Sequence, residues 1–129
     1  MPESLPRPTD AELEILTVLW SRGPSTVREV YEVLQQRRKS AQYSTVLKFM
    51  QIMAQKGLVR RDDSERAHVY EASQPREWTQ RQLAGDLLQR GFDWSMKNLM
   101  IGALSARKAS KKELAELRKL LDEYEKGKR

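Results

Sequence analysis

Polar and basic side chains gather along one predicted helix, near residues 43–56. Apolar residues at helical spacing, from Val46 to Met53, bury one face of this segment and leave the opposite face polar. Hydroxyls and amides near a helix N-terminus suit phosphate oxygens, and Lys48 can reach a phosphate or a guanine edge. The residues predicted to contact DNA here are Gln42, Tyr43, Ser44, Thr45, Lys48 and Gln51. The alternative is an ordinary solvated helix face.

A second group of basic side chains follows on a predicted β-hairpin. Two short β-prone runs, at residues 58–61 and 67–70, flank a polar turn at residues 62–65, which is the pattern of a hairpin. The acids of this turn, Asp62, Asp63 and Glu65, disfavour its insertion into a DNA groove, so we expect the strands to touch phosphate instead. The predicted contacts on the hairpin are Arg60, Arg61, Arg66 and His68. The alternative is that these charges simply occupy an exposed hairpin edge.

The sequence shows no comparable pattern of residues for metal binding or catalysis. His68 is the only histidine and the chain has no cysteine, so we expect no zinc or other metal site. The sequence suggests no set of nucleophile, base and orienting group. We therefore predict a protein that is not an enzyme and that needs no cofactor.

The elements around these residues follow a familiar order. Threonine–glutamate capping boxes, Thr9 with Glu12 and Thr26 with Glu29, start two helices before the polar one, and Gly57 ends the polar helix. Three short helices followed by a hairpin is the order of a winged helix-turn-helix. The predicted fold class is mainly α with a small β-hairpin, an N-terminal winged helix-turn-helix followed by a C-terminal helical dimerisation region.

The rest of the chain, from about residue 75, is predicted to form three more helices, the last starting at a third capping box, Ser110 with Glu113. Roughly 50 residues in three helices cannot bury so much apolar surface alone, so we expect a second copy to cover it in a homodimer. The predicted domains are 1–74 for DNA binding and 75–129 for dimerisation. The predicted dimerisation residues are Trp78, Leu87, Leu99, Met100, Leu104, Leu114, Leu117, Leu120, Leu121 and Tyr124.

The charge balance favours a polyanionic partner or an anionic surface. The 129 residues carry a formal net charge of +6, and the basic excess begins only after residue 35. No stretch approaches the roughly 20 apolar residues that span a bilayer, and residues 1–8 lack the apolar segment of a secretory signal. We therefore expect no membrane insertion and a cytoplasmic protein.

Several short motifs follow one another in a specific order. They are Glu-Ile-Leu at 14–16, Leu-Trp at 19–20, Thr-Val-Arg-Glu-Val at 26–30, Ser-Thr-Val at 44–46, Lys-Gly-Leu-Val at 56–59, Arg66 with Val-Tyr at 69–70, Phe-Asp at 92–93 with Ser95, and the leucines of 113–121. With this order and spacing, the chain resembles the penicillinase-repressor (BlaI/MecI/CopY) family of bacterial regulators over residues 9–124.

The resemblance implies an N-terminal winged helix, a C-terminal dimerisation region and binding of a homodimer to inverted-repeat operators, which blocks transcription. A membrane-embedded sensor protease often relieves repression in this family by cutting the C-terminal helices. The corresponding position lies near Gly102 and Ala103 and lacks the Asn-Phe pair of the antibiotic-responsive members. The absence of cysteine excludes the copper-sensing branch. Lys48 and Ile52 stand where many relatives carry Thr and Arg, so their operator sequence does not transfer.

The predicted function is therefore a sequence-specific, DNA-binding transcriptional repressor, acting as a homodimer on double-stranded DNA. The alternative is a winged-helix module for protein–protein contact without DNA binding. The acidic hairpin turn and the acidic first helix favour this alternative.

Overall fold

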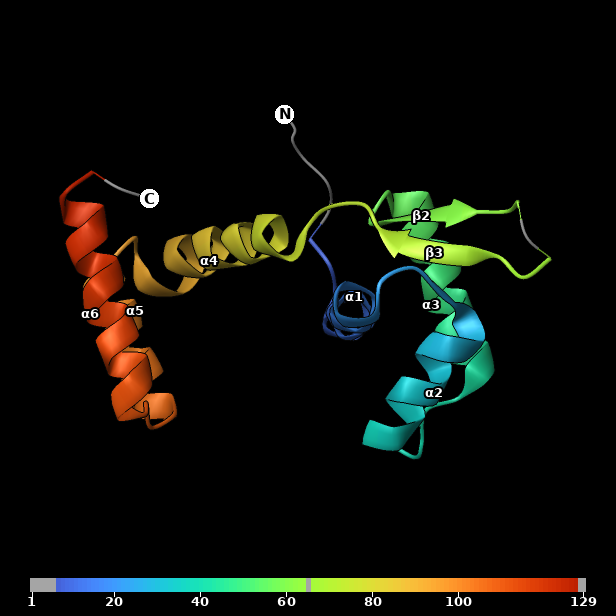
Figure 1. Cartoon of the computed structure of the whole chain (residues 1–129), viewed down its shortest axis with the longest axis horizontal. Helices are drawn as coiled ribbons and strands as arrows, with labels where there is room; N and C mark the ends of the chain where they lie inside the picture. The colour runs from blue at the N-terminus through green and yellow to red at the C-terminus, as the bar shows by residue number, and fades with distance from the viewer. Residues whose placement is uncertain (1–6, 65, 128–129) are drawn as a thin grey trace. The chain divides into compact units, whose positions relative to one another are not determined.

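The computed structural model describes residues 7–64 and 66–127 (Figure 1). These residues form two compact units, and the division falls after Ala84, inside a helix. The boundary predicted between residues 74 and 75 lies just before that helix starts. The elements are α1 (Asp10–Arg22), β1 (Ser25–Thr26), α2 (Val27–Arg37), α3 (Tyr43–Lys56), β2 (Val59–Asp62), β3 (Val69–Ala72), α4 (Arg76–Phe92), α5 (Met96–Ala106) and α6 (Lys111–Glu125).

The first two helices begin as their sequences predict. The Thr9 hydroxyl accepts the Glu12 backbone N–H while the Glu12 carboxylate accepts the Thr9 N–H, and Thr26 and Glu29 repeat this arrangement. Each box satisfies backbone donors that a helix start would otherwise leave unpaired. Helix α3 ends at Gly57, whose φ of 84° lies in the left-handed region that glycine adopts at low cost.

The core of the N-terminal unit lies between α1, α2, α3 and the small sheet. Its fully buried members include Val30, Met50 and Met53, each 0% exposed. The other buried apolar residues are Ile15, Leu16, Val18, Leu19, Val27, Leu34, Val46, Leu58, Val59 and Tyr70. Because each helix contributes one apolar face, the polar faces of α2 and α3 remain outside.

The sheet has three antiparallel strands in the order β1-β3-β2, one strand more than the sequence predicted. β1 is only two residues long and pairs Ser25 with Tyr70 and Thr26 with Val69. β2 and β3 form the expected hairpin, each starting one or two residues later than predicted. The predicted winged helix-turn-helix is confirmed, with α2 and α3 as the helix pair and the hairpin as the wing (Figure 1).

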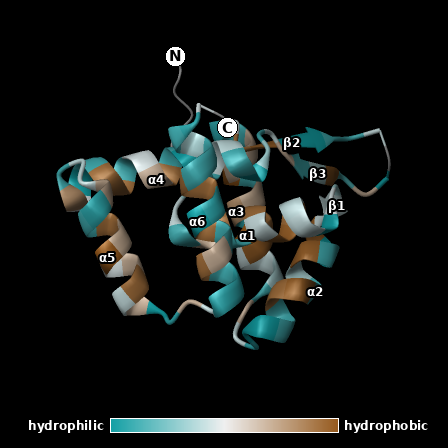
Figure 2. Cartoon of the chain, turned by 60° about the vertical axis from the view of Figure 1, so that its left-hand side comes forward, coloured by the Kyte–Doolittle hydropathy of each residue, from teal (hydrophilic) through white to brown (hydrophobic). Residues whose placement is uncertain are grey.

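The C-terminal unit is built differently. Among the described residues 85–127, none is buried. Apolar residues recur along α4, α5 and α6, shown brown in Figure 2. The third capping box forms only in part, because the Ser110 hydroxyl accepts the Glu113 N–H whereas the Glu113 carboxylate pairs with Arg107, at 2.9 and 3.1 Å. No helix in the described part of the chain is long and apolar enough to cross a membrane.

Candidate nucleic-acid interface

Helix α3 carries most of the predicted contact residues, and its two faces differ in burial. Val46, Met50 and Met53 lie in the core. This buried stripe fixes the rotation of α3 about its axis, so the polar side chains stay at the surface. The exposed residues include all those predicted on this helix and at its entry: Gln42, Tyr43, Ser44, Thr45, Lys48 and Gln51.

The start of α3 has no side-chain cap among the described residues. Gln42 is its N-cap residue and makes no capping hydrogen bond, whereas hydroxyls cap α1, α2, α5 and α6. The first backbone N–H groups of α3 therefore have no side-chain partner and lie at the positive end of the helix dipole. A phosphate oxygen is a suitable acceptor for such groups.

The register of the wing separates two arginines that the sequence grouped together. Arg61 is opposite Tyr70, whose side chain is buried in the core, and Arg60 is opposite Glu71. Since neighbouring residues of a strand point to opposite faces, the Arg61 side chain lies on the same face of the hairpin as Tyr70 and the Arg60 side chain lies on the other. The Arg60 guanidinium pairs with Glu71 at 3.0 Å and donates to the Ser73 carbonyl at 3.3 Å.

An acidic residue joins two of the predicted wing contacts. The Asp63 carboxylate lies 2.8 Å from Arg61 Nε and 2.8 Å from His68 Nδ1. Hydrogen bonds to Tyr70 and to Asp63 raise the pKa of Arg61, which keeps its guanidinium charged. Asp63 thus orients Arg61 and His68 but also offsets part of the charge of Arg61. Glu65, the third acid predicted at this turn, lies outside the described residues.

A hollow of about 330 Å³ brings residues of α2, α3 and the wing together. Five of the predicted contacts line it: Tyr43, Gln51, Arg61, Arg66 and His68. Thr26 and Arg28, from the start of α2, line the same hollow and were not predicted as contacts. The sequence signal that could have found Arg28 is its position in the first turn of the helix that precedes the polar one.

Two other predicted residues lie on the far side of α3. Gln42 and Thr45 line a separate hollow of about 220 Å³, together with Ala11 of α1 and Phe49. Ser44 and Lys48 line neither hollow and, by helical spacing, lie on the arc between them. The predicted residues of α3 and its entry therefore form one continuous band around the exposed side of this helix, here called the polar band, rather than a single pocket.

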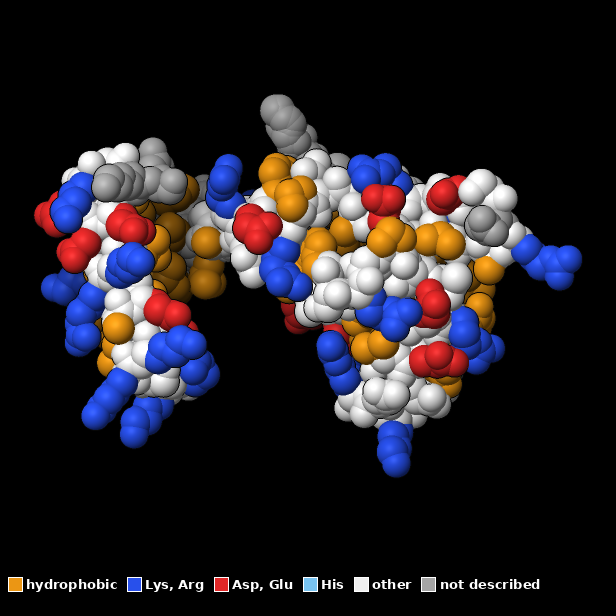
Figure 3. Space-filling view, in the orientation of Figure 1, with side chains coloured by type: hydrophobic (Ala, Val, Ile, Leu, Met, Phe, Trp, Pro, Cys, Tyr) orange, Lys and Arg blue, Asp and Glu red, His pale blue; other side chains and the backbone are white. Residues whose placement is uncertain are grey.

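The basic residues of this surface fall into two classes. Several are already paired with carboxylates: Arg22 with Glu29, Arg38 with Glu14, Lys56 with Glu12, Arg60 with Glu71, and Arg61 with Asp63. Arg28, Lys48 and Arg66 are exposed and form no ion pair with any described residue. These three charges are the ones most available to an anionic partner. In Figure 3, Lys and Arg side chains stand out from the surface of the N-terminal unit.

No group of three or more His, Cys, Asp or Glu residues in the described part of the chain is placed to hold a metal ion. The surface around α3 instead carries basic, hydroxyl and amide side chains. These are the groups that contact phosphate oxygens and base edges.

Comparison with known proteins gives the family. The model of the penicillinase repressor family matches residues 8–123, nearly the whole length. The chain belongs to the penicillinase repressor family. The resemblance found in the sequence is thereby confirmed. Because this is a family of repressors, the prediction of a protein that is not an enzyme is confirmed as well.

Two curated proteins are similar to part of this chain. They are the transcriptional regulators BlaI of Mycobacterium tuberculosis strains CDC 1551 / Oshkosh and ATCC 25618 / H37Rv. Each is 45% identical over 67 residues, which cover 51% of this chain and 48% of the relative. The chain thus matches about half the length of these relatives.

A solved structure is similar in fold. The solution structure of the DNA-binding domain of the repressor BlaI superposes with a TM-score of 0.50 at 23% sequence identity. The match covers 57% of this chain and 89% of that domain. This likeness supports the winged-helix fold on grounds independent of the element order.

Proposed function

We propose that the chain is a sequence-specific DNA-binding repressor that acts as a homodimer on inverted-repeat operators. The observation that carries this proposal is the exposed polar band of α3, which includes Lys48, together with Arg28 and Arg66 nearby. None of these three basic side chains has an ion-pair partner among the described residues. A helix with such a face fits the major groove, where base edges are read, and basic side chains around it neutralise phosphates. In a bacterial cell, such a repressor acts in the cytoplasm, where the chromosome lies.

The C-terminal unit supports the homodimer. Its exposed apolar side chains include Ile101, Leu121 and Tyr124, which are 53%, 63% and 61% exposed. Exposed apolar side chains in such number are costly in water, and a second copy of the same unit is their simplest cover. A two-fold dimer would hold two α3 helices against two half-sites, whose separation is a multiple of one DNA turn.

The route by which repression ends stays a prediction. Gly102 and Ala103, near the position where relatives are cut, both lie inside α5. A protease binds its substrate as an extended strand, so a cut here requires local unwinding of α5. Because no described residue of α5 is buried, that unwinding exposes no core of the single chain.

The proposal is tested by selecting bound fragments from the host genome and titrating one of them, fluorescently labelled, with the wild-type chain and with Lys48→Ala. Lys48→Ala should weaken binding about tenfold, since a base or phosphate contact is worth roughly 1–3 kcal/mol. Lys97→Ala is the matched control, because Lys97 is an equally charged, exposed residue on α5. Equal affinities of the wild-type chain and Lys48→Ala would remove α3 from the reading role. Absent or salt-independent binding of the wild-type chain would favour the protein–protein module.

A further inference from the structure

One arginine of the α2–α3–wing hollow is stacked on aromatic rings. The Arg28 guanidinium carbon lies 4.8 Å from the centre of the Tyr43 ring and 5.8 Å from that of Tyr31. The two rings meet edge to face, with centroids 5.7 Å apart and planes at 79°. A guanidinium within about 6 Å of a ring centre is attracted by the negative face of the ring. The contact spans two helices, because Arg28 and Tyr31 belong to α2 and Tyr43 begins α3.

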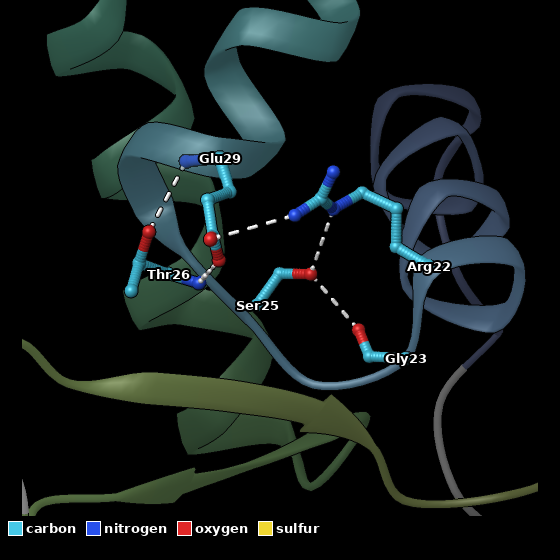
Figure 4. Close-up of polar contacts among 5 residues, drawn as sticks. All are labelled: Arg22, Gly23, Ser25, Thr26 and Glu29. Atoms are coloured by element: carbon cyan, nitrogen blue, oxygen red, sulfur yellow. Dashed lines mark hydrogen bonds and ion pairs between the residues drawn. The ribbon is translucent and has the colours of Figure 1, made fainter.

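The backbone that carries Arg28 is held in place by its own network (Figure 4). Arg22 Nε donates to the Ser25 hydroxyl at 3.2 Å, and that hydroxyl donates to the Gly23 carbonyl at 2.9 Å. Glu29 accepts the Thr26 N–H at 2.9 Å and pairs with Arg22 at 3.4 Å. The first turn of α2 is therefore fixed to the end of α1, and the Arg28 side chain starts from a fixed point.

The same network leaves the charge of Arg28 uncompensated. Glu29, its neighbour in sequence, is already engaged with Thr26 and Arg22. Arg28 is exposed and forms no ion pair within the described residues. A guanidinium that stacks by its face keeps the N–H donors of its edge for a planar or tetrahedral anion. In the hollow that Arg28 lines, Arg66 supplies a second such charge.

From this geometry we infer that Arg28 contacts a DNA phosphate and that Tyr43 is the residue that positions it. The inference rests on the proposed DNA binding and deepens it. Tyr43 then acts through its ring beneath Arg28, with Tyr31 supporting that ring, and its hydroxyl is not needed. This assigns Tyr43 a role different from the direct DNA contact that the sequence predicted.

The test measures how the affinity of the full chain for a labelled, genome-selected duplex depends on salt. Each phosphate contact contributes about 0.9 to the slope of log affinity against log salt. Arg28→Gln should weaken binding about three- to tenfold and make the slope shallower by about 1.8 for a homodimer, which would lose two contacts. Arg37→Gln, at the other end of α2, makes the same charge change and should leave the slope unchanged.

Tyrosine variants separate positioning from direct contact. Tyr43→Phe keeps the ring and should behave as the wild-type chain, whereas Tyr43→Leu should reproduce the slope change of Arg28→Gln. Combining Tyr43→Leu with Arg28→Gln should add no further change. Thermal unfolding by circular dichroism checks that each variant is folded. If Tyr43→Leu does not fold, Tyr31→Leu replaces it and should shift the slope in the same direction by a smaller amount.

Each contrary outcome has a distinct meaning. An unchanged slope in Arg28→Gln overturns the phosphate contact, and Lys48→Ala then shows whether DNA binding itself still holds. Equal losses in Tyr43→Phe and Tyr43→Leu overturn the positioning role, because the hydroxyl would then be the contacting group. A wild-type chain that binds no duplex overturns this inference together with the proposed function.

Discussion

The two units of this chain use apolar residues in opposite ways. In the N-terminal unit, the apolar faces of three helices and a small sheet meet one another, and residues such as Met50 and Val30 lose all contact with water. In the C-terminal unit, apolar residues of α5 and α6 are as frequent, yet no described residue there is buried. Apolar surface stabilises a fold only when it is removed from water. The difference indicates that the first unit is complete within one chain, and it supports the proposal that a second copy covers the incomplete second unit.

This contrast also separates the two proposed roles. The complete unit carries the polar band of α3 and the basic side chains around it, so its partner is polar and charged. The incomplete unit exposes leucine, isoleucine and tyrosine side chains, so we expect its partner to be apolar. Figure 3 shows hydrophobic side chains beside α6. Changes in one unit should therefore affect DNA contact or fold stability, and changes in the other should affect assembly.

The largest effect is expected from Leu117→Glu combined with Leu121→Glu in α6. Two charges on the apolar face should prevent assembly, so that each chain binds one half-site alone. Losing the linkage between two half-sites should weaken binding to a two-site duplex about 10²-fold or more. Sedimentation equilibrium measures the mass, and fluorescence anisotropy the affinity.

The matched control is Arg118→Glu with Lys119→Glu, which adds more negative charge to exposed positions of the same helix. This control should remain dimeric. A dimer that persists in the leucine variant would show that the interface lies elsewhere and would break the contrast between the units.

A smaller effect, confined to the N-terminal unit, is expected from Glu12→Gln. The Glu12 side chain is almost fully buried, accepts the Thr9 N–H and lies 2.8 Å from Lys56 Nζ, which joins α1 to α3. Removing this carboxylate leaves Lys56 without its partner and should cost about 1–3 kcal/mol of unfolding free energy at pH 7. Glu14→Gln, which breaks the more exposed pair with Arg38, should cost less than about 1 kcal/mol.

The same residue predicts a pH dependence. Burial raises the pKa of Glu12, but its bonds to Lys56 and Thr9 outweigh burial and hold the pKa below the ordinary value of 4.5. A carboxyl with a lowered folded-state pKa stabilises the fold above its unfolded value, and this contribution is lost as pH falls through the folded value. Denaturant unfolding should therefore show the difference between wild-type chain and Glu12→Gln shrinking below pH 4.5. A constant difference would contradict the ionised pair.

The smallest effect is expected from Asp63→Asn on the wing. Asp63 offsets the charge of Arg61, so its neutralisation should strengthen DNA binding about two- to fivefold. Glu71→Gln makes the same change on the opposite face, beside Arg60, and should have less effect. Weaker binding of Asp63→Asn would mean that Asp63 matters chiefly for orienting Arg61. Neither variant should alter the mass of the dimer.

Local signals made much of this fold predictable. The capping boxes at Thr9 and Thr26, the apolar stripe of α3 and Gly57 at its end each depend on residues a few positions apart, and all formed as expected. β1 was missed because a strand of two residues has no periodicity, and it exists only through its pairing with β3.

The candidate site was less predictable, because its details depend on packing between elements. Which of Arg60 and Arg61 shares the face of Tyr70 follows from the register of β2 against β3, which the sequence alone does not give. The stacking of Arg28 on Tyr43 depends on how α2 packs against α3. Glu113 shows the limit of a motif, since nearby Arg107 takes the carboxylate that the capping box required.

One measurement tests the central claim most directly, namely sedimentation equilibrium of the wild-type chain alone and with a genome-selected duplex at low salt. The account predicts a dimer in both samples, with two chains on each duplex, and loss of the complex as salt is raised. A single chain that remains a monomer and leaves the duplex free at low ionic strength would contradict it.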